Sequence, residues 1–254
     1  MLSKWLGGLA LAAAIVFSVP ALAAGEFTNE QKEQLGKFIH DYLISHPEVI
    51  KESVEELDRR EKAAETADRE KTVTNEASKL FRSASQSVVG NPDGDVTIVE
   101  FFDYNCGYCK QSLANVTKLI ESDPKLRVIL KDFAILGPDS VEVAEVATAA
   151  RQQLKGPKYW EFHKKLLGVR GHIGKAQAVA IAKELGADTD QLEKDIKNPA
   201  TRATLAEVEA LAEKLHFSGT PSWVIGQDAY VGGLSYPDMK AKVDNVRKCG
   251  KGEC

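Results

Sequence analysis

The N-terminal hydrophobic run differs from every later one along the 254-residue chain. Residues 6–19 are almost entirely apolar, follow a single lysine, Lys4, and precede the small residues Ala21 and Ala23. This run is too short to span a bilayer comfortably and is typical of a secretory signal peptide. An uncleaved N-terminal anchor is the alternative. We expect residues 1–23 to be a cleaved signal peptide and the mature protein to be exported to the periplasm.

Residues 24–57 carry apolar residues at helical spacing. Thr28 and Gln31 resemble a capping box, and an apolar helical face follows at Leu35, Phe38, Ile39, Tyr42 and Leu43, and then at Ile50, Val54 and Leu57. Two short helices bury too little surface to be stable alone. They would pack either on the main domain or on other copies of the chain. We favour an N-terminal helical oligomerisation region, as a dimer or trimer.

Residues 58–86 begin with a strongly charged stretch. Between Asp58 and Lys79, 12 of the 22 residues are Asp, Glu, Lys or Arg, and Val73 is the only large apolar residue. The alanines favour helix, and no glycine or proline interrupts it. A solvated surface helix is one interpretation; a charged helical linker is the other.

Residues 87–254 alternate between strand-like and helix-like patterns. Near-continuous apolar runs at 96–102 and 126–133 predict buried parallel strands, with a helix over 107–121 between them. Five helical patterns follow between about 139 and 216, then two short strands at 222–225 and 229–232, and a closing helix at 236–248. This order of elements predicts an α/β layer fold.

Composition and charge narrow the function classes. The chain is 43% hydrophobic and 28% charged, which is the ordinary balance of a globular protein. Its formal net charge is −4, so there is no general basic surface for a nucleic-acid partner. We also find no nucleotide-binding loop and no Ser-His-Asp pattern, and we expect no cofactor.

Two cysteines stand where the first strand meets its helix, in the run Cys106-Gly107-Tyr108-Cys109. In an exported protein this spacing is typical of a redox-active pair. The positive end of the helix dipole would stabilise the Cys106 thiolate, and Cys109, deeper in the helix, would stay a protonated resolving thiol. Half of a structural zinc site is the alternative, but no second set of ligands has suitable spacing, so we expect no metal.

The other two cysteines, Cys249 and Cys254, lie close together in a glycine-rich tail. We expect a small structural disulfide between them, although a free thiol or a link to a partner is also possible.

Glu100 and the Thr220-Pro221 pair are further candidates for the site around the cysteines. Glu100 interrupts an apolar strand, so it either faces outward or is a buried proton acceptor that helps to deprotonate Cys109. In the second case Lys131, on the neighbouring strand, is a plausible charge partner. Thr220-Pro221 forms a bend before the strand at 222–225; if the bond is cis, the Thr220 backbone can pair with a bound substrate chain.

Three stretches together carry a family resemblance: residues 99–109 around the cysteines, 158–163, and 219–226 around Thr220-Pro221. The chain resembles the DsbA family of thioredoxin-fold proteins, and within it the Com-like and ScsC-like branch with charged N-terminal helical extensions. The resemblance implies a thioredoxin fold over 87–254 with a helical insertion at about 139–216. It also implies that Cys106 is the nucleophile, Cys109 the resolving thiol, Glu100 the buried acid and Pro221 a cis-proline.

The Gly107-Tyr108 dipeptide and Thr220 differ from the strongly oxidising DsbA pattern and look like the corresponding residues of the disulfide isomerase DsbC. The resemblance therefore implies a less oxidising site. We expect a periplasmic thiol–disulfide oxidoreductase that favours isomerase or reductase activity on exported proteins. Gly107, Tyr108, Thr220 and Pro221 would contact these substrates, and a DsbB-like or DsbD-like membrane protein would be the redox partner. A disulfide oxidase is one alternative; an oligomeric envelope or metal-binding protein with an incidental thiol pair is another.

Overall fold

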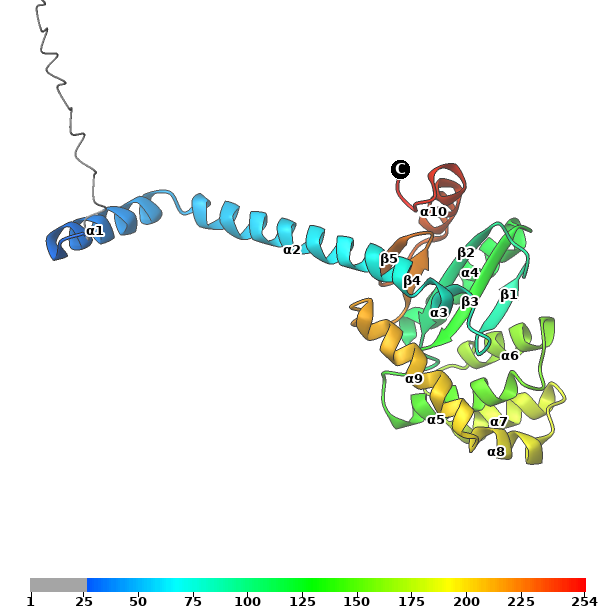
Figure 1. Cartoon of the computed structure of the whole chain (residues 1–254). Helices are drawn as coiled ribbons and strands as arrows, with labels where there is room; N and C mark the ends of the chain where they lie inside the picture. Colours follow the sequence, from blue (N-terminus) through cyan, green and yellow to red (C-terminus); the bar gives the residue numbers. More distant parts are fainter. Residues whose placement is uncertain (1–26) are drawn as a thin grey trace, which may run out of the picture. The chain divides into compact units, whose positions relative to one another are not determined.

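The computed structural model describes residues 27–254, so the expected signal peptide at 1–23 lies outside the described residues. The chain divides into two compact units, with the boundary between Leu57 and Asp58. Figure 1 shows the helices and strands of both units. Within the described residues, no helix combines the length and the apolar character needed to cross a membrane.

The first unit contains helix α1 (Asn29–Ser45) and the beginning of helix α2 (Glu48–Asn75). Thr28 caps α1: its hydroxyl accepts from the Gln31 backbone N–H, and the Gln31 side chain accepts from the Thr28 N–H. No residue of α1 is buried, although the helix carries large apolar side chains. The helix α2 continues without a break through the charged stretch, where the sequence suggested a separate linker.

The second unit is built on a five-stranded mixed sheet. Its strands are β1 (Ser87–Gly90), β2 (Val96–Phe102), β3 (Leu126–Asp132), β4 (Ser222–Ile225) and β5 (Asp228–Val231), in the order β1-β3-β2-β4-β5. Strands β2 and β3 are parallel, and every other neighbouring pair is antiparallel. The apolar runs at 96–102 and 126–132 therefore form the centre of the sheet, while β1 is a short edge strand that the sequence analysis did not predict.

Helices lie on both faces of this sheet and beyond one end of it (Figure 1). They are α3 (Ala77–Phe81), α4 (Gly107–Ser122), α5 (Pro138–Ala150), α6 (Pro157–Leu167), α7 (Lys175–Glu184), α8 (Thr189–Ile196), α9 (Pro199–Lys214) and α10 (Tyr236–Cys249). Side chains of α4, α10 and the helices α5 to α8 join one hydrophobic cluster, which we call the α4 face. Side chains of α3 and α9 join a second cluster on the other side, which we call the α9 face.

Alternation along β2 assigns its side chains to the two faces. Ile98 and Phe102 belong to the cluster of the α4 face, and Val99 and Phe101 belong to that of the α9 face. Because successive strand residues point to opposite sides, Glu100 faces α4. This placement decides which groups can reach the cysteines.

The folded part of the second unit begins upstream of residue 87. Val73 of α2 and Leu80 of α3 are buried in the cluster of the α9 face. The Arg69 side chain donates to the backbone carbonyls of Leu215 and His216. The end of the charged stretch is therefore packed onto the domain, because its one large apolar residue finds a core there.

Candidate active site

Cys106 lies where the central strand β2 ends and helix α4 begins. It is the N-cap residue of α4, with extended backbone angles and no side-chain capping hydrogen bond of its own. Only 5% of its surface is exposed, and its thiol donates to the Thr220 backbone carbonyl over 3.1 Å. The unpaired N–H groups of the first helical turn surround such a position, and they favour a negative charge there.

Cys109 lies one turn further along α4 and is fully buried. Both it and Cys106 are free thiols. Burial raises the pKa of the Cys109 thiol well above its ordinary value, and the nearby Glu100 carboxyl raises it further. Cys109 therefore needs a proton acceptor before it can attack a disulfide, whereas Cys106 is the sulfur closer to solvent.

The two residues between the cysteines are open to solvent. Tyr108 is 67% exposed, and a Cβ atom added at Gly107 would meet no heavy atom within 4 Å. The glycine therefore leaves the space beside Cys106 free for an approaching chain.

The Thr220-Pro221 peptide bond is cis. Thr220 is partly exposed, Pro221 is buried, and the Pro221 carbonyl accepts from the Gly232 N–H over 2.8 Å. The loop before β4 thus brings the Thr220 carbonyl against Cys106, and it joins two stretches that are far apart in the sequence.

Glu100 is 2% exposed and lies on the α4 face beneath the cysteines. Burial raises the pKa of its carboxyl to about 8. A carboxyl with a pKa close to neutral can accept a proton and return it at physiological pH.

Lys131 is not the charge partner of Glu100, which corrects our expectation. It pairs with Phe101 across the parallel ladder, so its side chain is on the opposite, α9 face. There its amino group donates to the Lys79 carbonyl over 2.8 Å and lies 3.9 Å from the Glu207 carboxylate. Side chains two positions apart along a strand share a face, whereas those of adjacent positions point to opposite faces.

Asp103 and Asn105 hold the segment that leads into Cys106, and neither was among the predicted site residues. The Asp103 carboxylate accepts from the Asn105 N–H and the Ser140 hydroxyl, and also from the Ile135 and Leu136 N–H groups. The Asn105 amide exchanges two hydrogen bonds with the Ile173 backbone. A polar residue directly after an apolar strand was the signal that could have found them.

Cys249 and Cys254 form a disulfide at the C-terminal end of α10, outside the cluster of residues around Cys106. Several contacts tie the loop that it closes to the domain, two of them through side chains of other elements. The Lys251 amino group lies 3.0 Å from the Glu70 carboxylate, and the Gly252 N–H donates to the Asp228 carboxylate.

Comparison with known families agrees with this geometry. The family described as DSBA-like thioredoxin domain matches residues 97–244, and the family described as Copper resistance protein ScsC N-terminal domain matches residues 31–64. The chain belongs to the DsbA-like thioredoxin family, whose members are thiol–disulfide oxidoreductases, and the expected thioredoxin-type α/β fold with N-terminal helices is confirmed.

Individual relatives cover different parts of the chain. A thioredoxin-like oxidoreductase from Silicibacter pomeroyi is 42% identical, with a TM-score of 0.64, over 68% of this chain and 98% of that one. BcfH of Salmonella enterica Typhimurium is 24% identical, with a TM-score of 0.73, over 85% of this chain and 95% of that one. At this identity the match shows a similar fold. A probable disulfide bond formation protein D from Bacillus cereus is 25% identical over 66% of this chain and 82% of that protein.

The sequence is also 27% identical over 161 residues to the Na(+)/H(+) antiporter NhaA 1 of Salinispora arenicola. The matched region is 63% of this chain but spans only 24% of the antiporter.

Proposed function

We propose that the protein is a periplasmic thiol–disulfide oxidoreductase that reduces and isomerises disulfides of exported proteins. The observation that carries this proposal is the position of Cys106 at the N-terminus of α4, with its sulfur at the Thr220 carbonyl and Cys109 buried one turn away.

In the proposed reaction, the Cys106 thiolate attacks one sulfur of a substrate disulfide and forms a mixed disulfide, and the other substrate sulfur leaves as a thiolate. A second substrate thiol can then attack the substrate sulfur of the mixed disulfide, which rearranges the substrate bond. Alternatively Cys109, deprotonated by Glu100, attacks the Cys106 sulfur, which gives a Cys106–Cys109 disulfide and a reduced substrate.

Apolar side chains support an unfolded or misfolded protein as the substrate. Tyr108 is exposed beside the cysteines, and Ile135 and Leu136 are 41% and 49% exposed. Their loop is held by Asp103, three residues before Cys106, so these side chains belong to the same end of the sheet. A folded protein buries such groups, whereas a misfolded one offers apolar segments that can cover them.

The apolar residues of the first unit support self-association, which isomerisation would use to hold a substrate between catalytic domains. Phe38 and Tyr42 of α1 are 66% and 44% exposed, and Ile50 and Val54 of α2 are each 52% exposed. Water-exposed side chains of this size are costly unless another surface covers them. The match of residues 31–64 to the ScsC N-terminal domain is consistent with a separate role for this unit.

Two assays test the activity. The protein should catalyse insulin reduction and refold scrambled ribonuclease, and Cys106→Ala should abolish both activities. Deletion of residues 24–57 should leave insulin reduction in place and remove most of the ribonuclease refolding. Retention of either activity in the Cys106 variant would contradict the proposal.

The direction of the reaction in the cell separates an isomerase or reductase from an oxidase. Alkylation of cells should trap Cys106 and Cys109 mostly as a dithiol, which a DsbD-like partner would maintain. A mostly oxidised pair would instead indicate a disulfide oxidase, recharged by a DsbB-like partner.

A further inference from the structure

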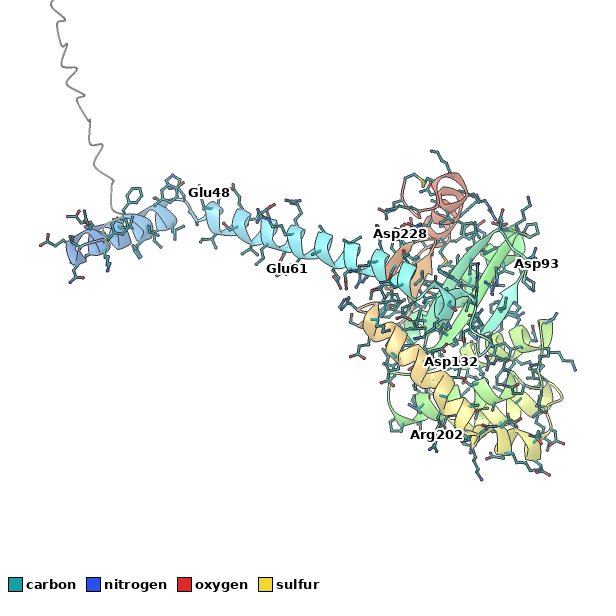
Figure 2. All side chains as sticks on the ribbon, viewed as in Figure 1. Glu48, Glu61, Asp93, Asp132, Arg202 and Asp228 are labelled. Atoms are coloured by element: carbon teal, nitrogen blue, oxygen red, sulfur yellow. A yellow bond between two sulfur atoms is a disulfide. The ribbon has the colours of Figure 1, made fainter. Side chains whose placement is uncertain are left out.

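A second buried carboxyl lies on the same face of the sheet as Glu100 and is not used in the reaction above. In the parallel ladder Glu100 pairs with Leu130, and Phe102 pairs with Asp132. Asp132 is therefore two positions beyond the partner of Glu100 and points to the same, α4 face. Figure 2 labels Asp132 near the junction of the sheet and the helices of the insertion.

Two buried tyrosines, Tyr104 and Tyr159, lie near these carboxyls. The Tyr104 ring contacts the Phe102 ring edge-on, with 5.0 Å between the ring centroids, and its hydroxyl is 3.2 Å from His163 Nδ1. Burial raises the pKa of Tyr104 most, and the neighbouring Tyr159, Asp132 and Glu100 raise it further. Both carboxyls therefore act electrostatically on the Tyr104 hydroxyl.

Several polar atoms in this region lack a hydrogen-bond partner. Among the described residues, seven buried side-chain atoms have none, and five of them are here: Gln86 Oε1, Asp132 Oδ1, Arg151 Nη1, Tyr159 OH and His163 Nε2. Buried polar groups in folded proteins are nearly always satisfied by protein or water. We therefore expect water at some of these atoms.

A surface pocket of about 210 Å³ reaches this group, and its lining includes Gln86, Ser87, Arg151 and Tyr159. A water molecule in the liquid takes up about 30 Å³, so the pocket has room for several. Arg151 alone would suit an anionic ligand, but the Asp132 carboxyl beside it disfavours one.

We propose that Asp132, together with Tyr104 and Tyr159, connects Glu100 to solvent at this pocket and carries away the proton that Cys109 loses. The inference rests on the proposed function and adds three positioning residues to it. Arg151 lines the same pocket as Tyr159.

The proton path acts when Cys109 resolves the mixed disulfide. The Cys109 thiol gives its proton to the Glu100 carboxylate, and the thiolate attacks the Cys106 sulfur of the mixed disulfide. The Cys106–Cys109 bond forms, the Cys106–substrate bond breaks, and the substrate thiolate takes a proton from solvent. Glu100 then passes its proton along the path to water in the pocket and becomes a carboxylate again.

The charged and polar groups around Asp132 allow its carboxyl to accept a proton and release it again. Burial raises the pKa of Asp132 to about 7; Arg151, after the end of α5, counteracts this, and Asp103, after β2, adds to it. From α6, Tyr159 faces the carboxyl, while burial lowers the pKa of His163 to about 3 and keeps its ring neutral. Asp132 and Glu100, with its pKa of about 8, therefore both titrate near neutral pH, which transfer of a proton between them requires.

The test separates the two sulfur attacks in the full-length reduced protein, using Ellman's reagent and stopped-flow absorbance. The first release of thionitrobenzoate reports attack by Cys106, and the second reports attack by Cys109 on the mixed disulfide. Asp132→Asn should leave the first rate within about twofold and slow the second about tenfold or more, with a loss of its pH dependence around neutrality.

Tyr159→Phe removes one hydroxyl but keeps the ring, and it should slow the second phase in the same way if Asp132→Asn fails to fold. Lys131→Met changes the buried neighbour of Asp132 on the opposite face and should leave the second phase unchanged. The proton path would be overturned if the second phase were unaffected in both Asp132→Asn and Tyr159→Phe. It would also be overturned if either substitution slowed the two phases equally. Glu100→Gln would still slow the second phase in that case, whereas a wild-type protein with no fast first phase would refute the proposed function itself.

Discussion

The Cys106 sulfur lies 3.1 Å from the Thr220 carbonyl oxygen, although 114 residues separate the two positions in the chain. This contact joins the N-terminus of helix α4 to the loop before β4, and it places a partly exposed backbone segment beside the proposed nucleophile. A substrate strand that pairs with this segment would present its disulfide to Cys106 and not to Cys109, which is buried. The assignment of different roles to the two thiols follows from this arrangement.

Replacement of Cys109 should trap substrates. The Cys109→Ala variant can still form a mixed disulfide through Cys106 but lacks the thiol that resolves it. We expect mixed disulfides with periplasmic proteins to accumulate and to be visible on non-reducing gels. Cys106→Ala is the matched control and should trap none. Equal trapping by the two variants would mean that the buried thiol also attacks substrates.

Glu100 should lower the stability of the protein at neutral pH. The pKa of its carboxyl is 4.5 ordinarily and about 8 in the folded protein, so the folded state binds the proton more tightly. The free energy of unfolding therefore falls as the pH rises from about 4.5 to 8, by roughly 3 kcal/mol at pH 7. This loss is absent in Glu100→Gln.

Urea unfolding of wild type and Glu100→Gln from pH 4 to pH 8 measures this effect. The stability of the variant relative to wild type should increase steadily with pH, whatever its value at pH 4. A difference that is constant across the range would show that Glu100 does not hold its proton more tightly in the folded protein.

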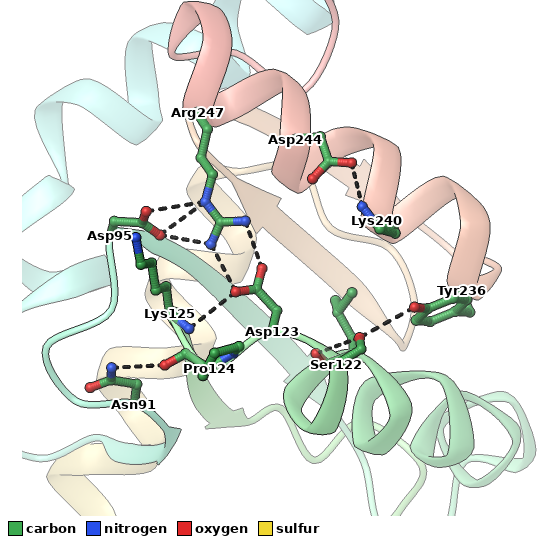
Figure 3. Close-up of polar contacts among 11 residues, drawn as sticks. Asn91, Asp95, Ser122, Asp123, Pro124, Lys125, Tyr236, Lys240, Asp244 and Arg247 are labelled. Carbon is green, nitrogen blue, oxygen red and sulfur yellow. Dashed lines mark hydrogen bonds and ion pairs between the residues drawn. The ribbon is translucent and has the colours of Figure 1, made fainter.

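Arg247 of α10 should contribute to stability through two carboxylates. Figure 3 shows its guanidinium group between Asp95, before β2, and Asp123, after α4. The shortest contact to each carboxylate is 2.7 Å. Hydrogen bonds from Arg247 lower the pKa of both carboxyls, so their contribution is present above the ordinary pKa of 3.8 and is lost as the pH falls further.

Arg247→Met should lower the thermal midpoint at pH 7 by on the order of 3 °C, with a smaller difference from wild type at pH 3. Lys240→Met is the control, because the Lys240–Asp244 pair on the same helix is exposed and joins no other element (Figure 3). It should change the midpoint little at either pH. Equal effects of the two substitutions would indicate that the ion pairs of Arg247 with Asp95 and Asp123 stabilise the protein no more than an ordinary surface pair.

Self-association should depend on the apolar face of α1. Phe38→Glu adds one negative charge to that face, where Phe38 is 66% exposed. Lys37→Gln makes the same change in charge on the opposite face of the helix and serves as the control. Sedimentation velocity should give an oligomer for wild type and the control, and a monomer for Phe38→Glu. A monomeric wild-type protein would remove this part of the account.

The central elements of the fold could be predicted because their signals are local. The runs at 96–102 and 126–132 are apolar on both faces, as buried strands are, and the helices of the insertion have clear periodicity. Strand β1 was missed because only two of its four residues, Val88 and Val89, are apolar, so the sequence shows no apolar run there. The continuous helix α2 was divided in the prediction because its hydrophobic pattern stops at residue 57, while its helical propensity does not.

The site could be predicted only in part. The spacing of the cysteines led us to propose Cys106 and Cys109 as the site, because an N-cap residue and a residue one turn into the helix lie close together. The partner of Glu100 was wrong, because Lys131 occupies an adjacent strand but the opposite face, and only the register decides this. Asp103 and Asn105 act through hydrogen bonds to segments far along the chain, so the polar residue directly after the strand was their only local sign. That Asp132 shares a face with Glu100 depends on the strand register, which no local pattern gives.

The most direct measurement of the central claim compares the reactivity of the two thiols in the folded protein. Cys106 in the Cys109→Ala variant should react with iodoacetamide at pH 7 faster than glutathione does, because the N-terminus of α4 favours its thiolate. Cys109 in the Cys106→Ala variant should remain almost unmodified until the protein unfolds. A Cys106 that reacts no faster than glutathione, or a Cys109 that reacts as fast as Cys106, would contradict the account.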